Sequence, residues 1–433
     1  MTTKERSLGY IVFLSFVAAI GGILFGYDTA VISGTTEIVK AQFGLSTGLE
    51  GWFVGCALIG SIIGVMVAGM LSDFLGRKKT MLIAALMFSV SAIGCAVCGN
   101  FSQLVVYRMI GGFGIGVVSI VSPIYISEVA PAEKRGTLVS LYQLFITIGF
   151  LLAYLMNYLI LRGAATDATG AELGTRMFNQ EYWRGMFGCE AIPDLLFLVL
   201  IFFIPESPRW LAIRGQRQDK SEEWKALREP GILKAVLVGS AIAILGQFMG
   251  VNAVLYYGPK IFQDAGLSGE GSMFSTVLVG VVNMLTTVIA LLIIDKVGRK
   301  QLVWWGVGGM IVCLLCIGTW FAVGTLPTWF LLTFFLLYVF CTAISISAVV
   351  FVLLSEMYPN RVRGLAMSIA GLALWVGTYL IGQLTPWMLE NLTPAGTFFL
   401  FAFCCLPYLF IMWKYIPETT GKTLEEIEAY WKK

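Results

Sequence analysis

Twelve long apolar runs dominate this sequence and constrain its fold more than any other feature. The hydrocarbon core of a bilayer is about 30 Å thick, and a helix needs roughly 20 apolar residues to cross it. Because the runs are unbroken, they favour helices over the strands of a membrane barrel, in which apolar and polar residues alternate. We therefore predict an all-α polytopic membrane protein. The predicted spans are Tyr10–Val31, Gly51–Leu71, Thr80–Gly99, Gln103–Tyr125, Thr137–Ile160, Arg184–Ile204, Gly231–Tyr257, Met273–Ile294, Leu302–Val323, Thr328–Leu354, Leu365–Met388 and Phe398–Ile416.

The composition also indicates a lipid environment. The apolar fraction is 58% and the charged fraction 13%, whereas soluble domains are about half apolar and about a quarter charged. The chain has no histidine, which excludes a histidine proton relay or a catalytic triad. The nine cysteines fall almost entirely in apolar runs, where they read as small hydrophobic residues. We therefore predict no enzymatic activity, no metal and no cofactor.

The basic residues predict an orientation in the membrane. Only four of the 29 lie in loops that follow odd-numbered spans: Lys40, Arg162, Arg176 and Lys260. Arg108 and Arg184 lie in or at spans, and all others lie in the two ends of the chain or in loops that follow even-numbered spans. Since cytoplasmic loops are enriched in Lys and Arg, both termini should be cytoplasmic. The net charge of +3 gives no reason to expect a nucleic-acid partner.

Three short motifs occur twice, in the same order, with one copy in each half of the sequence. The copies are Asp73–Lys78 with Asp295–Lys300, Ser127–Gly136 with Ser355–Gly364, and Pro205–Ser207 with Pro417–Thr419. All copies fall on the expected cytoplasmic side, which indicates parallel repeats. We predict two six-helix halves, residues 1–211 and 231–433, joined by a short cytoplasmic connector at 212–230.

Acidic and basic residues recur at fixed spacing in these repeated loops. Positive-inside anchoring alone would explain the basic residues, but it would not explain their acidic partners. We therefore interpret the loops as a cytoplasmic latch that favours an outward-open state and breaks when the halves rock. Its predicted members are Asp73, Arg77, Glu128 and Arg135 in the first half, and Asp295, Arg299, Glu356 and Arg363 in the second.

Several longer motifs resemble those of the sugar porter family of the major facilitator superfamily. They are Phe25–Gly34, Pro205–Leu211, Gln247–Asn252 and Pro417–Lys422 together with the Gly-Arg-Lys loops. The resemblance covers nearly the whole chain and is strongest to bacterial proton-coupled D-xylose symporters. It implies the major facilitator fold, alternating access, and a monosaccharide and a proton as partners. It also implies a multi-pass monomer in the inner membrane of a bacterium.

The resemblance further implies a central sugar site between the halves. The matching positions are Gln143, Gln247, Asn252 and Asn283 for the amides, and Phe25, Tyr256, Tyr257, Phe351 and Trp375 for the aromatic wall. Amides offer donors and acceptors to sugar hydroxyls; the alternative is that they join helices. The sequence departs from the family at Gly246, at Ser347–Phe351 and at Leu374. The resemblance makes D-xylose the first expectation. Because of these departures, other pentoses and hexoses stay open.

Charged residues inside the spans are candidates for proton coupling. Asp28, Arg108 and Glu190 match the positions that the family uses for this purpose, and facilitative members carry an uncharged residue at the position of Asp28. We therefore predict proton symport, with a facilitative uniporter as the main alternative and a non-transporting sugar sensor as the third. Asp194, one helical turn beyond Glu190, has no counterpart in the family pattern. It either faces a water-filled cavity, which we favour, or carries a second proton.

Overall fold

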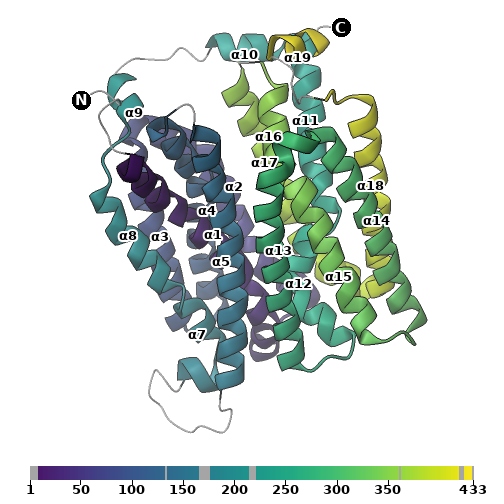
Figure 1. Cartoon of the computed structure of the whole chain (residues 1–433). Helices are drawn as coiled ribbons and strands as arrows, with labels where there is room; N and C mark the ends of the chain where they lie inside the picture. Colours follow the sequence, from purple (N-terminus) through teal and green to yellow (C-terminus); the bar gives the residue numbers. More distant parts are fainter. Residues whose placement is uncertain are drawn as a thin grey trace. The chain divides into compact units, whose positions relative to one another are not determined.

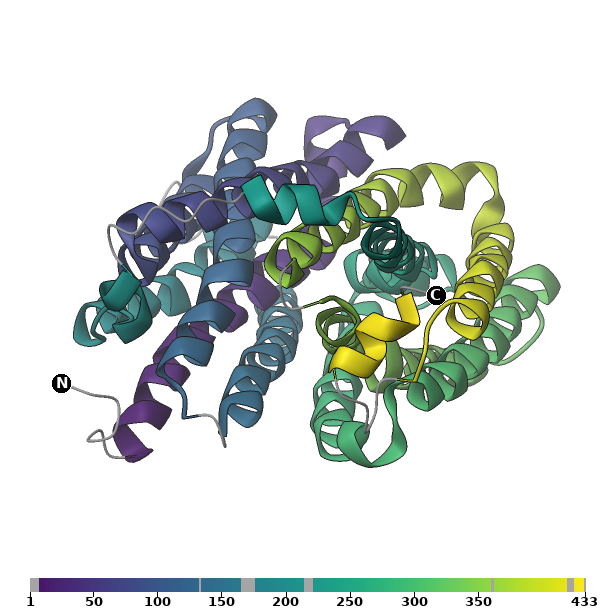
Figure 2. The ribbon, with the colours of Figure 1, turned by 90° about the horizontal axis from the view of Figure 1, so that it is seen from above.

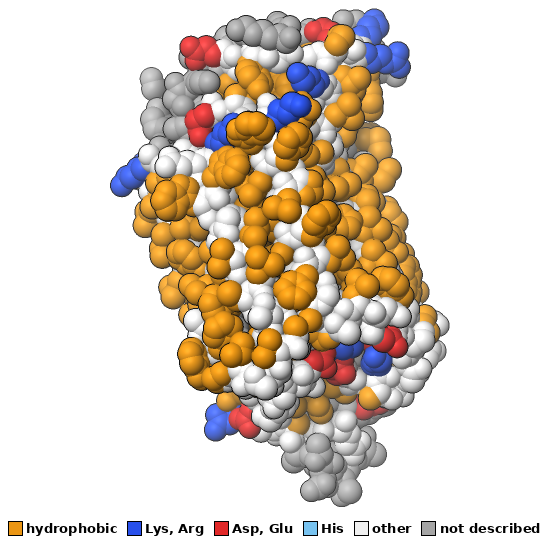
Figure 3. Space-filling view, turned by 90° about the vertical axis from the view of Figure 1, so that its right-hand side faces the viewer, with side chains coloured by type: hydrophobic (Ala, Val, Ile, Leu, Met, Phe, Trp, Pro, Cys, Tyr) orange, Lys and Arg blue, Asp and Glu red, His pale blue; other side chains and the backbone are white. Residues whose placement is uncertain are grey.

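The computed structural model describes residues 8–131, 134–164, 176–213, 221–359, 362–418 and 424–431, which form helices without strands (Figure 1). Within these residues, twelve helical segments are long and apolar enough to cross a membrane, which confirms the predicted number of spans. On the face seen in Figure 3, hydrophobic side chains cover the middle and charged side chains gather near the two ends. This distribution is that of a protein whose middle is surrounded by lipid.

The chain divides into two compact units, of which the first contains residues 1–216 and 255–280. Within it α1 packs on α5, and α4 packs on α2 and α3. Gly26 of α1 and Gly149 of α5 face each other so closely that a Cβ on either would overlap the opposite backbone. The helices are α1 (Leu8–Phe43), α2 (Thr47–Leu75), α3 (Arg77–Val97), α4 (Phe101–Val129), α5 (Arg135–Gly163), η3 (Arg176–Gln180), α7 (Trp183–Gly188), α8 (Ala191–Phe203) and α9 (Pro208–Ile213). The first unit also contains most of α12 (Val251–Asp264) and the beginning of α13 (Gly269–Val297).

The second unit contains residues 217–254 and 281–433. Within it α11 packs on α17, and α14 packs on α15 and α18. Seen from above, the short helix α19 lies across the ends of α11 and α16 (Figure 2). The further helices are α10 (Ser221–Leu227), α11 (Pro230–Phe248), α14 (Arg299–Val323), α15 (Thr328–Thr342), η4 (Ala343–Ser347), α16 (Ala348–Met357), α17 (Arg363–Asn391), α18 (Thr393–Lys414) and α19 (Leu424–Trp431). Part of the predicted connector, residues 214–220, lies outside the described residues.

Several helices run well past the spans predicted from hydropathy. For example, α1 continues to Phe43, twelve residues beyond the predicted end at Val31. The extension buries Ile32, Thr36 and Val39, so packing against neighbouring helices maintains it after the apolar run has ended. A hydropathy window detects only the part of a helix that lies in the hydrocarbon.

Two of the predicted spans are broken helices. The sixth divides into α7 and α8 at Glu190, where the ring of Pro193 prevents a helical hydrogen bond to the carbonyl of Cys189. The seventh divides into α11 and α12 at Gly250, whose φ of +89° is strained for other residues. The Tyr338 hydroxyl donates a 2.6 Å hydrogen bond to the freed carbonyl of Met249. Each break lies beside residues predicted to act in transport.

Candidate functional site

A buried ion pair joins α1 and α4 within the first unit. Arg108 of α4 donates from Nη1 to the Oδ1 of Asp28 on α1, and also to the main-chain oxygen of Asp28 at 3.2 Å. Both side chains are almost completely buried. The guanidinium carbon of Arg108 also lies 5.4 Å from the centre of the Phe187 ring. The structure therefore brings together two of the three residues that the sequence implicates in proton coupling.

The ion pair leaves polar atoms unsatisfied. The Oδ2 of Asp28 and the Nε of Arg108 have no hydrogen-bond partner among the described residues. A buried charge or polar atom without a partner is costly, and in a native structure it points to strain or function. A proton on Asp28 would remove the carboxylate charge that holds Arg108, so this pair is suited to coupling protonation to helix movement.

Glu190 and Asp194 lie in the same unit, at the α7–α8 break and in the first turn of α8. Both are buried, and the Oε1 of Glu190 and both carboxyl oxygens of Asp194 lack partners among the described residues. Asp194 is 0% exposed. The favoured prediction, that Asp194 faces a water-filled cavity, is therefore wrong in this structure. The inner face of α8 packs against α1 and α3 instead.

An amide cluster surrounds the α11–α12 break in the second unit. The Oε1 of Gln247 accepts 2.6 Å and 3.2 Å hydrogen bonds from Asn252 Nδ2 and Thr378 Oγ1. Trp375, one turn before Thr378 on α17, is 7% exposed. Asn283 on α13 is 9% exposed, and its amide makes no hydrogen bond within the described residues. Hydrogen bonds within the cluster thus hold Gln247 and Asn252 in place, whereas the amide of Asn283 on α13 is available to bind a ligand.

The remaining predicted sugar contacts belong to the first unit, apart from Phe351. Gln143 and Phe25 are half-buried on α5 and α1, whereas Tyr256 and Tyr257 on α12 are fully buried. The Tyr154 hydroxyl holds this part of α12 through a 2.9 Å hydrogen bond to the carbonyl of Leu255. The Gln143 amide makes no hydrogen bond within the described part of the chain. The side chain of Phe351, in α16, lies outside the described residues.

The loops of the first unit that carry the repeated motifs form an ion network. Arg77 binds Glu128 through two parallel hydrogen bonds of 3.0 Å, and it binds Asp73 at 3.2 Å. Arg77 and Glu128 are 7% and 4% exposed, so the pair is buried and bidentate. Arg135 is exposed and forms no ion pair within the described residues. Three of the four predicted members therefore lie together.

The second unit repeats this arrangement. Arg299 donates to Glu356 at 3.0 Å, while Arg363 donates to the carbonyl of Tyr358 at 3.3 Å. The side chain of Asp295 lies outside the described residues. The turns that precede Arg77 and Arg299 contain glycines with φ of +96° and +98°, a conformation that other residues rarely adopt. Both copies of the motif thus have the same local backbone.

Two acids complete these networks, and sequence reasoning did not include them in the latch. The carboxylate of Glu206 accepts from the main-chain N–H groups of Arg77 and Lys78 at 2.9 and 3.0 Å, at the first turn of α3. Glu418 accepts in the same way from Lys300 at 3.1 Å. The exposed amides and dipole of a helix N-terminus favour such an anion. The recurrence of Pro-Glu in both halves was the available signal.

A third network, also missed, lies at the opposite ends of the helices of the first unit. Glu50 of α2 is 0% exposed and binds Lys40 of α1 at 2.6 Å and Lys260 of α12 at 2.7 Å. Lys260 also binds Glu37 at 3.3 Å. The network joins α12 to α1 and α2, so movement of α12 away from these helices must break it.

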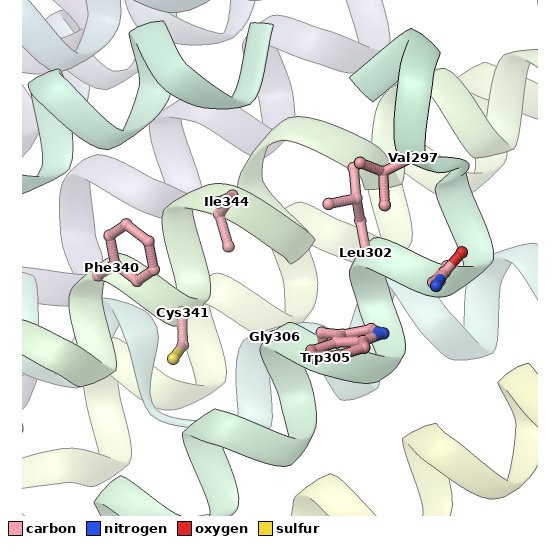
Figure 4. Close-up of a pocket in the computed structure, with 8 residues that line it drawn as sticks. Val297, Leu302, Trp305, Gly306, Phe340, Cys341 and Ile344 are labelled. Carbon is pink, nitrogen blue, oxygen red and sulfur yellow. The ribbon is translucent and has the colours of Figure 1, made fainter. Parts of the chain in front are cut away.

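A cavity of about 380 Å³ in the second unit does not coincide with the predicted sugar contacts (Figure 4). It is lined by the end of α13, the start of α14, the end of α15 and η4. Trp305 in its wall is 75% exposed, and Gln301 is the one amide among the lining residues. The cavity therefore opens at the surface of this unit and lacks the polar groups that a sugar requires.

Twelve spans, repeated ion networks, broken helices and buried ionisable groups define a secondary transporter built from two parallel repeats. A model of the family described as "Sugar (and other) transporter" matches residues 14–230 and 216–431. The chain therefore belongs to the sugar transporter family, with the major facilitator fold.

Individual relatives extend over the whole chain. The arabinose-proton symporter of Bacillus subtilis (strain 168) is 36% identical over 460 residues, covering 100% of this chain and 97% of that protein. The D-xylose-proton symporter of Escherichia coli (strain K12) is 36% identical over 490 residues, covering 100% and 98%. An inward-open structure of the xylose transporter XylE from E. coli has a TM-score of 0.82 at 37% identity, covering 98% of this chain and 100% of that one.

Proposed function

We propose that this protein is a proton-coupled monosaccharide symporter that works by alternating access, and that it has no enzymatic activity. The observation that carries the proposal is the buried Arg108–Asp28 pair, in which one carboxyl oxygen has no partner among the described residues. A static structural pair is normally satisfied on all sides, because unsatisfied buried groups are costly. Two relatives that span the whole chain are named as proton symporters.

The sugar that we propose first is D-xylose or a related pentose. The relatives named for arabinose and D-xylose support this choice. A relative from Synechocystis sp. that is 35% identical over 463 residues is named a glucose transport protein, so hexoses belong in the test. The amides of Gln143, Gln247, Asn252 and Asn283 are proposed to bind the hydroxyls. The aromatic side chains of Phe25, Tyr256, Tyr257, Phe351 and Trp375 are proposed to cover the ring.

The proposed setting is a bacterial cell membrane, in which the protein acts as a monomer with both termini in the cytoplasm. The asymmetric distribution of Lys and Arg supports this orientation. In this orientation the Arg77–Glu128 and Arg299–Glu356 pairs act as cytoplasmic latches, and the Glu50–Lys260 pair lies on the outer side.

The test is sugar uptake into proteoliposomes with and without an imposed inward proton gradient, across pentoses and hexoses. When one proton moves with each sugar, a pH difference of one unit supports about tenfold accumulation, because it corresponds to about 1.4 kcal/mol. We expect a pentose to accumulate close to this limit. Uptake that only equilibrates, with or without the gradient, would identify a uniporter and contradict the proposal.

Replacement of Gln247 by alanine should weaken sugar binding. The change removes the oxygen that bridges Asn252 and Thr378, and each lost hydrogen bond costs about 1 kcal/mol, or more when a buried partner stays unpaired. We expect the KM of sugar exchange to rise about tenfold or more, with a smaller rise for Thr378→Val. A lower thermal stability with an unchanged KM would instead show that these amides only join helices.

A further inference from the structure

Asp194 occupies a position that the packing of α8 reserves for apolar residues. The buried residues of this helix are Asp194, Phe197 and Ile201, which are spaced along one face. The other face is strongly exposed, with Ile192 71% and Phe203 67% accessible. An apolar side chain would complete the buried face, yet an acid stands there. Acids at such positions inside a membrane are functional candidates by default.

The acids around Asp194 outnumber the available cations. Asp28, Glu190 and Asp194 are all buried, and each interacts electrostatically with at least one of the others. Within the described residues, Arg108 is the one cation that acts on Glu190, and the charged group that acts on Asp194 is Asp28. The nearby Arg184 is bound to Glu181 at 2.5 Å and to the carbonyl of Cys98 at 2.7 Å.

Electroneutrality limits how many of the three acids, Asp28, Glu190 and Asp194, can be ionised at once. Ionised carboxylates in hydrocarbon require a partner, and Arg108 can neutralise only one of the three. In this structure that one is Asp28, since Arg108 donates to it directly. From this charge balance we expect Asp194 and Glu190 to be protonated, so that the three acids together hold two protons.

We propose that Asp194 is a second proton-carrying residue, which receives the proton that Asp28 has taken from outside and releases its own toward the cytoplasm in every cycle. This inference rests on the proposed proton symport. Protonation of Asp28 would leave Arg108 without an anion, and loss of the Asp194 proton restores one anion for one cation. Transfer of the Asp28 proton to Asp194, by way of Glu190, then regenerates the Arg108–Asp28 pair. One proton crosses per cycle, and no other charge changes.

The surroundings of Asp194 contain the groups that such a relay needs. Titratable groups reach this region from every helix that packs there: Tyr27 and Asp28 from α1, Cys95 from α3, Arg108 from α4, and Cys189 and Glu190 from the α7–α8 break. Asp28 and Asp194 both act electrostatically on Glu190, so Glu190 is the natural intermediate between them. The Tyr27 hydroxyl donates a 3.3 Å hydrogen bond to the carbonyl of Met186.

The deciding variant is Asp194→Asn, because asparagine has the shape of a protonated aspartic acid but cannot release a proton. Accumulation under a pH difference of one unit should fall from about tenfold in the wild type to about one. Sugar-driven proton entry, followed with a pH-sensitive dye, should be lost in parallel. Asp194→Glu, which retains a titratable group, should restore much of both. Sugar exchange without a gradient reports that the variants are folded.

Ser15→Ala is the matched control, because Ser15 is also fully buried in this unit with an unpartnered hydroxyl; it should accumulate sugar like the wild type. If Asp194→Asn accumulates sugar within twofold of the wild type, Asp194 is permanently protonated and the inference is overturned. If asparagine prevents folding, Asp194→Ser supplies the same comparison. Failure of the wild type to accumulate sugar would instead overturn the proposed symport itself.

Discussion

Asp28→Asn should abolish uphill sugar accumulation while sugar exchange at equal concentrations persists. The amide oxygen of asparagine can still accept a hydrogen bond from Arg108, so the helices stay joined, but the side chain can neither take up nor release a proton. Under a pH difference of one unit, the accumulation ratio should fall from about tenfold to about one. Radiolabelled sugar uptake and counterflow in the same proteoliposomes measure the two activities separately.

Glu270→Gln is the matched control for this experiment. It also removes an acid from the first unit, but Glu270 is 57% exposed and its pair with Arg162 is loose, at 3.7 Å. Surface pairs of this kind contribute little, so accumulation should be unchanged. Full accumulation by Asp28→Asn would show that the Arg108–Asp28 pair is structural and would refute its role in coupling.

Arg77→Met should strongly destabilise the first unit. The change leaves Glu128 buried at 4% exposure without its bidentate partner, and breaking a buried pair from one side costs about 3–5 kcal/mol. Arg77→Lys should be intermediate, because an ammonium group cannot form two parallel hydrogen bonds. Thermal unfolding of the detergent-solubilised protein, without added sugar, measures the loss of stability.

Two further variants distinguish the loss of this ion pair from the general effect of removing a charge. Lys79→Ala removes an exposed basic residue two positions away and should leave the melting temperature nearly unchanged. Arg77→Met combined with Glu128→Leu removes both partners and should recover much of the lost stability. If the double variant were as unstable as Arg77→Met alone, the unpaired carboxylate would not be the cause.

Sequence patterns were sufficient for the features that local spacing determines. Apolar runs indicate spans because each must cover the hydrocarbon, and the twelve helices confirm their number. The repeated Gly-Arg-Lys turns indicated an ionic partner for Arg77 and for Arg299, and the structure pairs them with Glu128 and Glu356. The residues of each motif lie at helix ends whose positions follow from the span pattern.

Features that depend on packing between distant segments could not be predicted from the spacing of residues in the sequence. Glu50 and Lys260 are 210 residues apart, and nothing in the spacing of either residue indicates the other. The break at Gly250 is hidden in a hydropathy average because its neighbours remain apolar. The burial of Asp194 follows from which face of α8 packs on α1 and α3, and periodicity within a uniformly apolar helix does not reveal that face.

The most direct test of the account is whether sugar moves protons when no pH gradient is imposed. Proteoliposomes containing a pH-sensitive dye would receive an inward sugar gradient at equal internal and external pH, with the membrane potential clamped. Proton symport predicts acidification of the lumen that requires a transported pentose, that saturates with sugar concentration, and that is absent in Asp28→Asn. Sugar entry at the same rate without any change in lumenal pH would contradict it.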